Sequence, residues 1–185
     1  MADTRLSDRR ILIMATDGFE QSELEVPLER LEAAGADVDI AALGTDDITG
    51  WDKDDWGDEV EVDLRIADVH VDNYDALVLP GGQMNPDLLR VEPDAIALIK
   101  AFAGAGKPVA AICHAPWLLV EAGLAKGRRL TSYKSIRTDV ANAGAEVVDE
   151  AVVVDGNIIT SRCPDDLPAF CDAIVEALVE AGAPV

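Results

Sequence analysis

The chain has 185 residues, the length of one globular domain, and 49% of them are hydrophobic, which excludes a disordered chain. Asp and Glu number 36 against 15 Lys and Arg, so the net charge is −21. A chain this acidic is repelled by nucleic acids and by anionic membranes, so we expect neither as a partner. The acidity predicts a strongly hydrated surface, of the kind suited to a salt-rich cytoplasm.

Cysteine usage and the first residues predict the cellular compartment. The three cysteines, Cys113, Cys163 and Cys171, do not have the spacing of a secreted disulfide framework. The N-terminal residues lack the apolar run of a signal peptide, and no uncharged stretch reaches the ~20 apolar residues that span a bilayer. We therefore expect a cytoplasmic protein in a reducing compartment.

Short apolar runs alternate with helical patterns along the chain. In chain order the predicted elements are strand 11–15, a helix ended by Gly35, strands 38–43 and 76–79, helix 93–103, strand 109–112, helix 116–122, a short strand near 130, helix 136–143, strands 152–154 and 158–161, and a helix from 164 or 165 to about 180. Asp155-Gly156-Asn157 is a hairpin turn. This alternation predicts a flavodoxin-like three-layer α/β sandwich, with a mostly parallel sheet and a small antiparallel appendage. We expect one domain over residues 1–185, with residues 1–9 as a loose N-terminal extension.

The stretch 45–63 differs in composition from the rest of the chain. It carries nine acidic residues against one basic residue, Lys53, and two of the three tryptophans, Trp51 and Trp56. We predict a loop whose tryptophans pack against their own domain, with a subunit contact as the alternative. The acidic spacing does not match an EF-hand loop, so no metal site is predicted.

Cys113 stands where a buried strand runs through a tight turn into a helix. This is the geometry of a nucleophile elbow, and the small neighbours Ala111 and Ala115 let the strand and the helix approach closely. The start of the helix lies beside the sulfur, and its positive end favours a thiolate. We therefore predict a lowered thiol pKa and a reactive cysteine; the alternative is a buried, inert one.

Few groups in the sequence can move a proton beside this cysteine. His114 is adjacent to it, whereas His70 lies in an acidic segment and is not expected to act. Glu23 is predicted in the first turn of the first helix. A protonated Glu23 would donate a hydrogen bond to a thiolate and lower the thiol pKa, whereas an ionised one would raise it. Glu20 is the alternative carboxyl.

A glycine pair, Gly81-Gly82, follows the buried strand 76–79. Glycines at such a position let backbone N–H groups face a bound oxygen, as an oxyanion hole requires. The carboxyl ends of parallel strands meet at one edge of the sheet, so we expect residues 17–23, 81–87 and 113–116 to form one site.

Six segments of the chain form a specific combination: TDGFEQSELEVPLERLEAAG, ALVLPGGQMNPDLLR, KPVAAICHAPWLL, LTSYKSI, NAGAEVVDEAVVVDGNIITSR and PDDLPAF. Together they resemble the PfpI intracellular-protease family of the ThiJ/PfpI superfamily, from about residue 10 to residue 179. The resemblance implies a single domain of the class I glutamine amidotransferase-like type. No histidine follows position 114 to serve as the separate base of an amidotransferase.

The resemblance also implies roles for individual residues. Cys113 would be the nucleophile, Glu23 the carboxyl bonded to its sulfur, and Gly82 and His114 the donors of backbone N–H groups. Tyr133, in the Thr-Ser-Tyr segment, would line the site. An acid of a neighbouring subunit would orient His114 in PfpI-like oligomers, and that position is Asp87.

The chain departs from the family pattern at three positions. Asp87 stands where the family has glutamate, which puts the peptidase triad in doubt because the side chain is one methylene shorter. Ala115 replaces the glycine that follows Cys-His. Cys163 is expected near the pocket, where it would either pack or act as a resolving thiol for oxidised Cys113.

These features predict a cysteine-dependent hydrolase or lyase of the stress response. Its substrates would be small carbonyl compounds and glycated proteins, as for a deglycase or a glyoxalase-like enzyme, or else peptides; the shorter Asp87 favours carbonyl adducts. No cofactor is expected, and the resemblance implies a homodimer or a higher homo-oligomer. The alternatives are a redox sensor or chaperone that uses oxidation of Cys113 with little turnover, and a purely structural domain.

Overall fold

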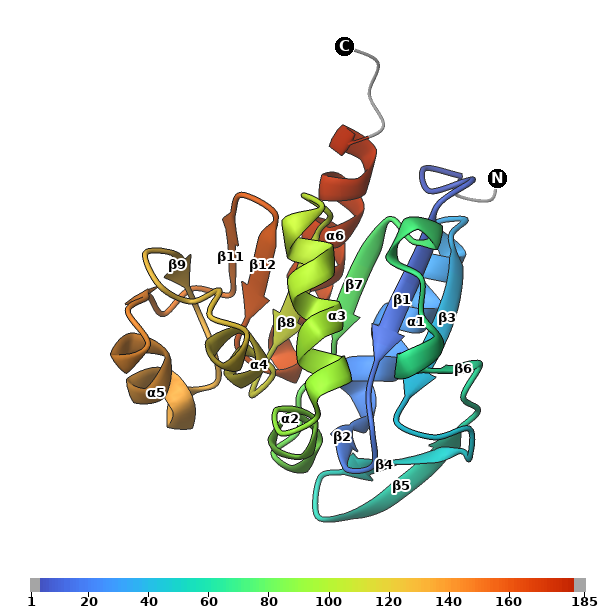
Figure 1. Ribbon diagram of the computed structural model, residues 1–185, viewed down its shortest axis with the longest axis horizontal. Helices are drawn as coiled ribbons and strands as arrows, with labels where there is room; N and C mark the ends of the chain where they lie inside the picture. The colour runs from blue at the N-terminus through green and yellow to red at the C-terminus, as the bar shows by residue number, and fades with distance from the viewer. Residues whose placement is uncertain (1–3, 182–185) are drawn as a thin grey trace.

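A seven-stranded sheet runs through the centre of the computed structural model, which describes residues 4–181 (Figure 1). In order across the sheet its strands are β11 (Val152–Asp155), β12 (Ile158–Ser161), β8 (Val109–Ile112), β7 (Ala76–Leu79), β1 (Arg10–Met14), β3 (Asp37–Ala42) and β6 (Leu64–Arg65). All neighbours run parallel except β11 and β12, which form the predicted hairpin. The mostly parallel sheet with an antiparallel addition is confirmed.

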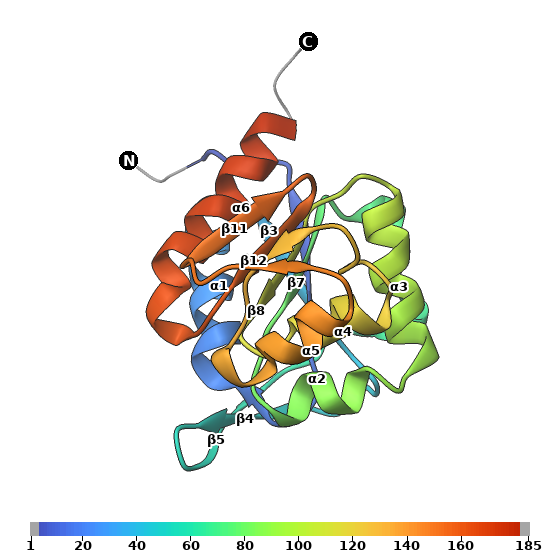
Figure 2. The ribbon, with the colours of Figure 1, turned by 90° about the vertical axis from the view of Figure 1, so that its left-hand side faces the viewer.

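Helices cover both faces of this sheet, as Figure 2 shows. One face carries α1 (Gln21–Ala33) and α6 (Leu167–Ala181), and the other carries α3 (Pro93–Gly104) and α4 (Pro116–Glu121), with α5 (Arg137–Asn142) packed beside α4. Successive side chains of a strand point to opposite faces. In β1, Ile11 and Ile13 therefore join the core under α1 and α6, whereas Leu12 and Met14 join the core under α3 and α4. The three-layer flavodoxin-like sandwich is confirmed.

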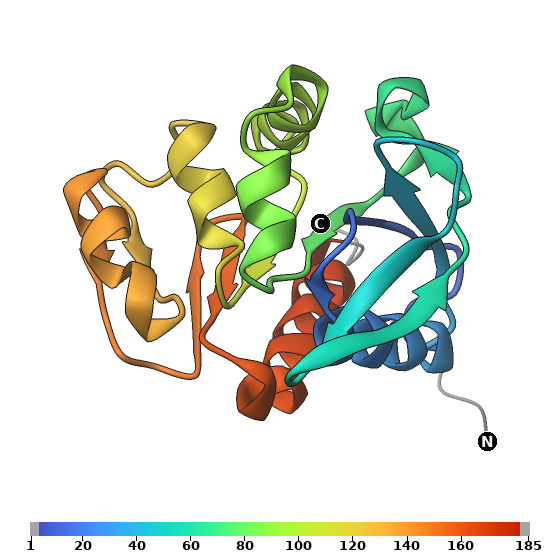
Figure 3. The same cartoon turned by 90° about the horizontal axis from the view of Figure 1, so that it is seen from below.

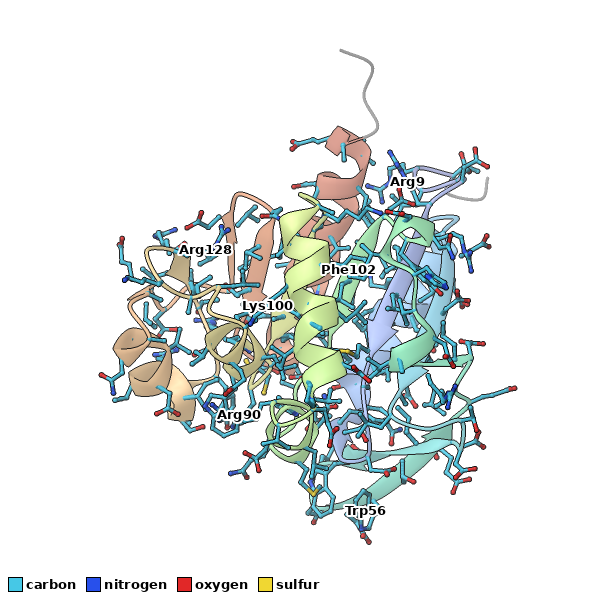
Figure 4. The ribbon with its side chains drawn as sticks, in the orientation of Figure 1. Arg9, Trp56, Arg90, Lys100, Phe102 and Arg128 are labelled. Carbon is cyan, nitrogen blue, oxygen red and sulfur yellow. The ribbon has the colours of Figure 1, made fainter. Side chains whose placement is uncertain are left out.

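Helix α3 illustrates why the sequence pattern was sufficient to predict these layers. It begins at Pro93, whose ring suits the first turn of a helix, and it ends before Gly106, which has a φ of +73°. Ile99 and Phe102 lie on the buried face, and Lys100 lies on the exposed face (Figure 4). Apolar residues at helical spacing thus become one wall of the core.

The remaining elements are short. They are β2 (Phe19–Glu20), β4 (Ile48–Asp52), β5 (Asp55–Val60), β9 (Arg129–Leu130), β10 (Glu146–Val147), α2 (Met84–Leu89) and the 3₁₀ turns η1 (Ile66–Asp68), η2 (Val71–Asn73), η3 (Lys134–Ile136) and η4 (Pro164–Asp166). The sequence pattern did not predict α2, which follows the Gly81-Gly82 turn. No helix among residues 4–181 is both long and apolar enough to cross a bilayer.

The acidic stretch 45–63 forms a hairpin rather than the predicted loop. Strands β4 and β5 pair antiparallel, and β2 adds to β4, so a second small sheet lies below the main one (Figures 1 and 3). Trp51 and Trp56 meet across the hairpin with their ring centroids 5.5 Å apart and their planes at 77°. Trp56 is 53% exposed and projects from the molecule in Figure 4. The expected packing against the domain therefore holds for Trp51, which is half-buried, and not for Trp56.

Residues 4–9 are packed against the domain. The Leu6 side chain is fully buried, and its N–H donates to the Ala34 carbonyl at 2.9 Å. Arg9 forms an ion pair with Asp75 at 3.1 Å. The prediction of a loose extension is therefore wrong for residues 4–9, because one leucine of this segment belongs to the core. Residues 1–3 of that predicted extension lie outside the described residues.

Candidate active site

A cavity of about 560 Å³ opens where β1, β7 and β8 end. Its lining residues are Gly18, Glu20, Trp51, Lys53, Gly82, Gln83, Met84, Cys113, His114, Tyr133 and Pro164. The three segments that we expected to meet at this edge of the sheet all contribute to the lining. The sequence analysis did not predict Trp51, Lys53 or Pro164 in this lining, because these residues lie far from Cys113 along the chain.

Cys113 occupies the sharp turn between β8 and α4. Its φ is +64°, a left-handed conformation that costs an L-residue roughly 1–2 kcal/mol. Backbone bonds hold the turn: the Cys113 N–H donates to the Ser161 carbonyl at 3.0 Å, and the Ala115 N–H donates to the Ile112 carbonyl at 2.9 Å. The residue is only 5% exposed, so its sulfur lies in the depth of the cavity. The predicted strand–turn–helix elbow is present.

The Gly81-Gly82 turn packs directly against the cysteine. A Cβ on Gly81 would lie 2.6 Å from Cys113 Cβ and 2.5 Å from Glu23 Oε2, closer than atoms of these kinds approach. Gly82 has a φ of +80°, which favours glycine. The backbone N–H groups of Gly82 and His114 lie close enough to the Cys113 sulfur to favour its ionised form.

A buried amide that the sequence did not reveal holds this turn in place. Asn85, in α2, is fully buried. Its Oδ1 accepts the Thr16 N–H at 2.8 Å, and its Nδ2 donates to the carbonyls of Pro80 at 2.8 Å and Gly81 at 3.2 Å. Asn85 thus ties the end of β1 to the glycine turn after β7. An Asn-Pro pair is a common turn signal, so no local pattern distinguishes Asn85 from an ordinary turn residue.

The His114 ring lies against the thiol although the two residues are adjacent in the chain. Its Nδ1 is 3.2 Å from Cys113 Sγ, and its Nε2 is 3.1 Å from Ser135 Oγ. The ring stacks on Tyr133 with the centroids 4.6 Å apart. Burial lowers the pKa of His114, which favours the neutral imidazole, a base that can take a proton. His70, by contrast, is exposed and does not line the cavity.

Glu23 is fully buried beside the same turn. Its Oε2 accepts the Gly81 N–H at 2.9 Å, and its Oε1 has no hydrogen-bond partner among residues 4–181. Burial, followed by the neighbouring Glu20 carboxylate, raises the pKa of Glu23 to about 8. The carboxyl is therefore mainly protonated at neutral pH. The proton belongs on Oε1, because a buried anionic oxygen without a donor is costly.

The pKa of the Cys113 thiol departs from its prediction. Burial raises this pKa, and the N–H groups of Gly82 and His114 oppose the rise only in part. The predicted lowering by the helix terminus is therefore wrong. The packing that makes the elbow also removes the sulfur from water, and loss of hydration disfavours a thiolate. The resting form of Cys113 is the thiol, in contact with a base.

Comparison with known proteins assigns this arrangement to a family. The profile described as the DJ-1/PfpI family matches residues 9–177. The chain belongs to the DJ-1/PfpI family. The resemblance noted in the sequence is thereby confirmed.

Similar members of the DJ-1/PfpI family span nearly the same length. A protein named deglycase PfpI, from Pyrococcus furiosus, is 44% identical over 169 residues, which cover 91% of this chain and 99% of its own. The Bacillus subtilis protein YraA, whose name classes it provisionally as a cysteine protease, is 44% identical over 163 residues, covering 88% of this chain and 94% of its own. The crystal structure of Drosophila melanogaster DJ-1beta matches with a TM-score of 0.85 at 32% identity, covering 92% of this chain and 90% of that one.

Three residues singled out by the DJ-1/PfpI pattern do not line the cavity: Glu23, which is buried behind the glycine turn, Asp87 and Cys163. Asp87 is exposed on α2, so any role toward His114 across a subunit boundary stays a prediction. Cys163 lines a separate cavity of about 170 Å³, which shares Tyr133 with the first. Cys163 thus lies near the Cys113 pocket, as expected, but outside its lining, where the next residue, Pro164, stands instead.

Two other predicted residues do line the cavity. Tyr133 forms one wall, and Glu20 lies half-buried at another, where burial and Asp52 raise its pKa. Glu20 therefore acts on Glu23 as a nearby carboxylate rather than replacing it as the carboxyl next to the sulfur. Within residues 4–181, no three His, Cys, Asp or Glu side chains are arranged to hold a metal ion.

Glu23→Gln is expected to flatten the dependence of stability on pH. The folded protein keeps the Glu23 proton up to a pKa of about 8, whereas the unfolded chain loses it near 4.5. Unfolding therefore releases a proton between these values, so this group stabilises the fold at low pH and the contribution is lost as the pH rises. Urea unfolding at about pH 5 and about pH 8.5 should show the wild type losing several kcal/mol more than Glu23→Gln.

The control for this measurement is Glu29→Gln, which removes an exposed carboxylate from the same helix. It should keep the wild-type difference between the two pH values. Equal pH dependence in the wild type and in Glu23→Gln would show that Glu23 does not hold its proton in the folded state.

Proposed function

We propose that the protein is a cysteine-dependent hydrolase that removes small-carbonyl adducts. The observation that carries the proposal is the 3.2 Å contact between Cys113 Sγ and His114 Nδ1 at the bottom of the cavity. Two relatives named deglycase, from Thermococcus kodakarensis and Pyrococcus furiosus, support the substrate class. Their identities to this chain are 46% and 44%.

In the proposed first step, the neutral His114 imidazole takes the Cys113 proton while the sulfur attacks a carbonyl carbon. A C–S bond forms, and the π electrons of the carbonyl move to its oxygen. Transfer to His114 is needed because the thiol is the resting form. This transfer also avoids a free buried thiolate and its desolvation cost. The charges, on the His114 imidazolium and the substrate oxygen, form only as the C–S bond is made.

Charge then develops on the substrate oxygen close to the sulfur. The N–H groups of Gly82 and His114 lie close to the sulfur, so an oxygen on the attached carbon lies within their range. Protonated Glu23, which accepts the Gly81 N–H behind the glycine turn, places no second negative charge near the developing oxyanion. These donors are held by the backbone and by burial, so little reorganisation accompanies the reaction.

The overall reaction is a hydrolysis that balances without a cofactor. An adduct of a 2-oxoaldehyde on an amine, thiol or guanidine takes up one water molecule. It yields the free amine, thiol or guanidine and a 2-hydroxy acid, because the aldehyde carbon is oxidised to the carboxyl group while the neighbouring ketone carbon is reduced to the alcohol within one fragment. Peptide hydrolysis is the alternative. It draws on the name of the Bacillus subtilis relative and would use the same nucleophile.

The proposal is tested with methylglyoxal adducts of N-acetylcysteine and N-acetylarginine, with lactate as the product followed by NMR. Such adducts also dissociate spontaneously, so the rate of lactate formation is compared with the rate of spontaneous dissociation. A rate above that limit shows action on the adduct itself, and a rate equal to it shows action on free methylglyoxal. No lactate, together with cleavage of a fluorogenic peptide, would replace the proposal by the peptidase.

The redox-sensor alternative has an observation of its own in its favour. The N–H groups and the protonated carboxyl around Cys113 would also bind the oxygens of a sulfinate. Two molecules of hydrogen peroxide would convert the thiol to sulfinic acid with release of two water molecules. Because Cys163 lies in a different cavity, intact mass after mild peroxide should show a gain of two oxygens and no disulfide. Sulfinate formation without turnover of any substrate would favour the sensor.

A further inference from the structure

We infer that Ser135 is a positioning residue for His114, so that one chain holds a complete Cys113–His114–Ser135 array. No carboxylate from a neighbouring subunit is then needed to orient the imidazole. The role of Ser135 in turnover rests on the proposed function. The contact between Ser135 and His114 does not depend on which substrate is used.

The contacts of the His114 ring carry the inference. Its two nitrogens face different partners: Nδ1 lies 3.2 Å from Cys113 Sγ, and Nε2 lies 3.1 Å from Ser135 Oγ. Tyr133 stacks on the ring at 4.6 Å with an angle of 26° between the planes. The ring is thus fixed in its plane by two polar contacts and across its plane by an aromatic face.

Ser135 is held in place by the same elbow that carries the nucleophile. The Tyr133 N–H donates to the Cys113 carbonyl at 2.8 Å, and the Ile136 N–H donates to the Tyr133 carbonyl at 3.1 Å. Two residues before Tyr133, the Thr131 N–H donates to Thr160 Oγ1 at 3.0 Å. The turn η3, which carries Ser135, is therefore anchored to the cysteine turn and to the sheet. Ser135 itself is exposed, and the contact of its Oγ with His114 Nε2 lies on this anchored turn.

The thiol and the hydroxyl together favour one tautomer of the imidazole. A neutral imidazole has one N–H donor and one acceptor nitrogen. The resting thiol donates toward Nδ1, so the ring proton belongs on Nε2, where Ser135 Oγ accepts it. The Nδ1 lone pair then faces the Cys113 proton. Without the hydroxyl, the tautomer with its proton on Nδ1 becomes more populated, and that tautomer cannot accept the proton of the thiol.

The other candidate for this role does not meet His114 within the chain. Asp87, which the family pattern places across a subunit boundary, is exposed on α2. The two candidates predict different effects of subunit assembly. Orientation of His114 by Ser135 does not depend on assembly, whereas orientation by Asp87 of a neighbouring subunit is lost when the subunits separate.

The direct test is the tautomer of His114 by ¹⁵N NMR of the imidazole nitrogens. The chain has two histidines, and exposed His70 serves as the internal reference. Wild-type His114 should carry its proton on Nε2. Ser135→Ala should raise the Nδ1-protonated fraction, whereas Ser135→Thr, which keeps the hydroxyl, should restore the wild-type spectrum.

Kinetics give a second readout. Ser135 does not line the cavity, so Ser135→Ala should lower kcat about three- to tenfold, the range of one neutral hydrogen bond, and leave KM unchanged. The rate of Cys113 alkylation by iodoacetamide should fall by a similar factor. Thr138→Ala is the matched control, because it removes an exposed hydroxyl next to the same turn.

The outcomes separate this inference from the proposed function. A tautomer shift in Ser135→Ala with no turnover of any substrate by the wild type would keep the inference and reject the hydrolase. Lactate formation by the wild type, with Ser135→Ala indistinguishable from Thr138→Ala in both spectrum and kcat, would reject the inference alone. A tautomer shift in Asp87→Asn, and none in Ser135→Ala, would assign the orientation to the neighbouring subunit.

Discussion

Replacing Cys113 with alanine is expected to reduce lactate formation to the uncatalysed rate, a loss of about a thousandfold or more. Cys113 is the thiol at the cavity, and its sulfur is the atom that His114 Nδ1 and the surrounding N–H groups face. Without it no C–S bond can form. The measurement is kcat/KM for the methylglyoxal adducts, with circular dichroism to show that the variant is folded.

The matched control is Cys163→Ala, which removes a thiol from the neighbouring cavity and should keep wild-type activity. A further variant separates chemistry from folding. Because Cys113 has a φ of +64°, Cys113→Gly should be more stable than Cys113→Ala by about 1 kcal/mol and equally inactive. Wild-type turnover in Cys113→Ala would overturn the mechanism, since the other two cysteines do not line the cavity.

Gly81→Ala is expected to produce a large loss of stability from a single methyl group. The added Cβ would lie 2.5 Å from Glu23 Oε2, 2.6 Å from Cys113 Cβ and 2.7 Å from the Ile112 carbonyl oxygen. The elbow backbone cannot move away, because β8 is hydrogen-bonded to strands on both sides. We expect the free energy of unfolding to fall by about 3 kcal/mol, the upper range for an overpacked core, and activity to be lost.

Gly104→Ala is the control for this prediction. It adds the same methyl group to a glycine of α3 that has no atom within 4 Å of the new position. Removing a glycine from a helix should raise stability by about 0.5–1 kcal/mol. Urea unfolding of both variants gives the comparison. If Gly81→Ala were as stable as Gly104→Ala, the glycine turn would not be in close contact with the cysteine.

The local pattern of the sequence was enough to predict the layers and the elbow. Apolar runs such as 109–112 stay buried on both faces, so a parallel sheet follows from the run itself. The strand, turn and helix around Cys113 are contiguous in the chain, and small residues on either side permit the tight approach. The Gly81-Gly82 turn follows its strand in the same way. These features depend on neighbours in the chain, which a sequence displays directly.

The hairpin β4–β5, the role of Asn85 and the contact of Ser135 with His114 could not be predicted in the same way. Each depends on segments brought together only when the sheet assembles, such as residues 114 and 135, which meet through a backbone bond from Tyr133 to the Cys113 carbonyl. In β4 and β5 the alternation of apolar and polar residues could not be recognised, because this stretch is rich in acidic residues and has few apolar ones.

The amino-acid sequence by itself determined the fold class, the family and the position of the cysteine elbow, because turns and apolar runs are properties of short stretches. Only the tertiary structure decided the protonation of the site. A helix terminus beside Cys113 predicted a thiolate, yet burial raises the pKa of both Cys113 and Glu23. Burial depends on everything that surrounds a group, and the loss of hydration outweighs the few backbone dipoles that the sequence places next to it.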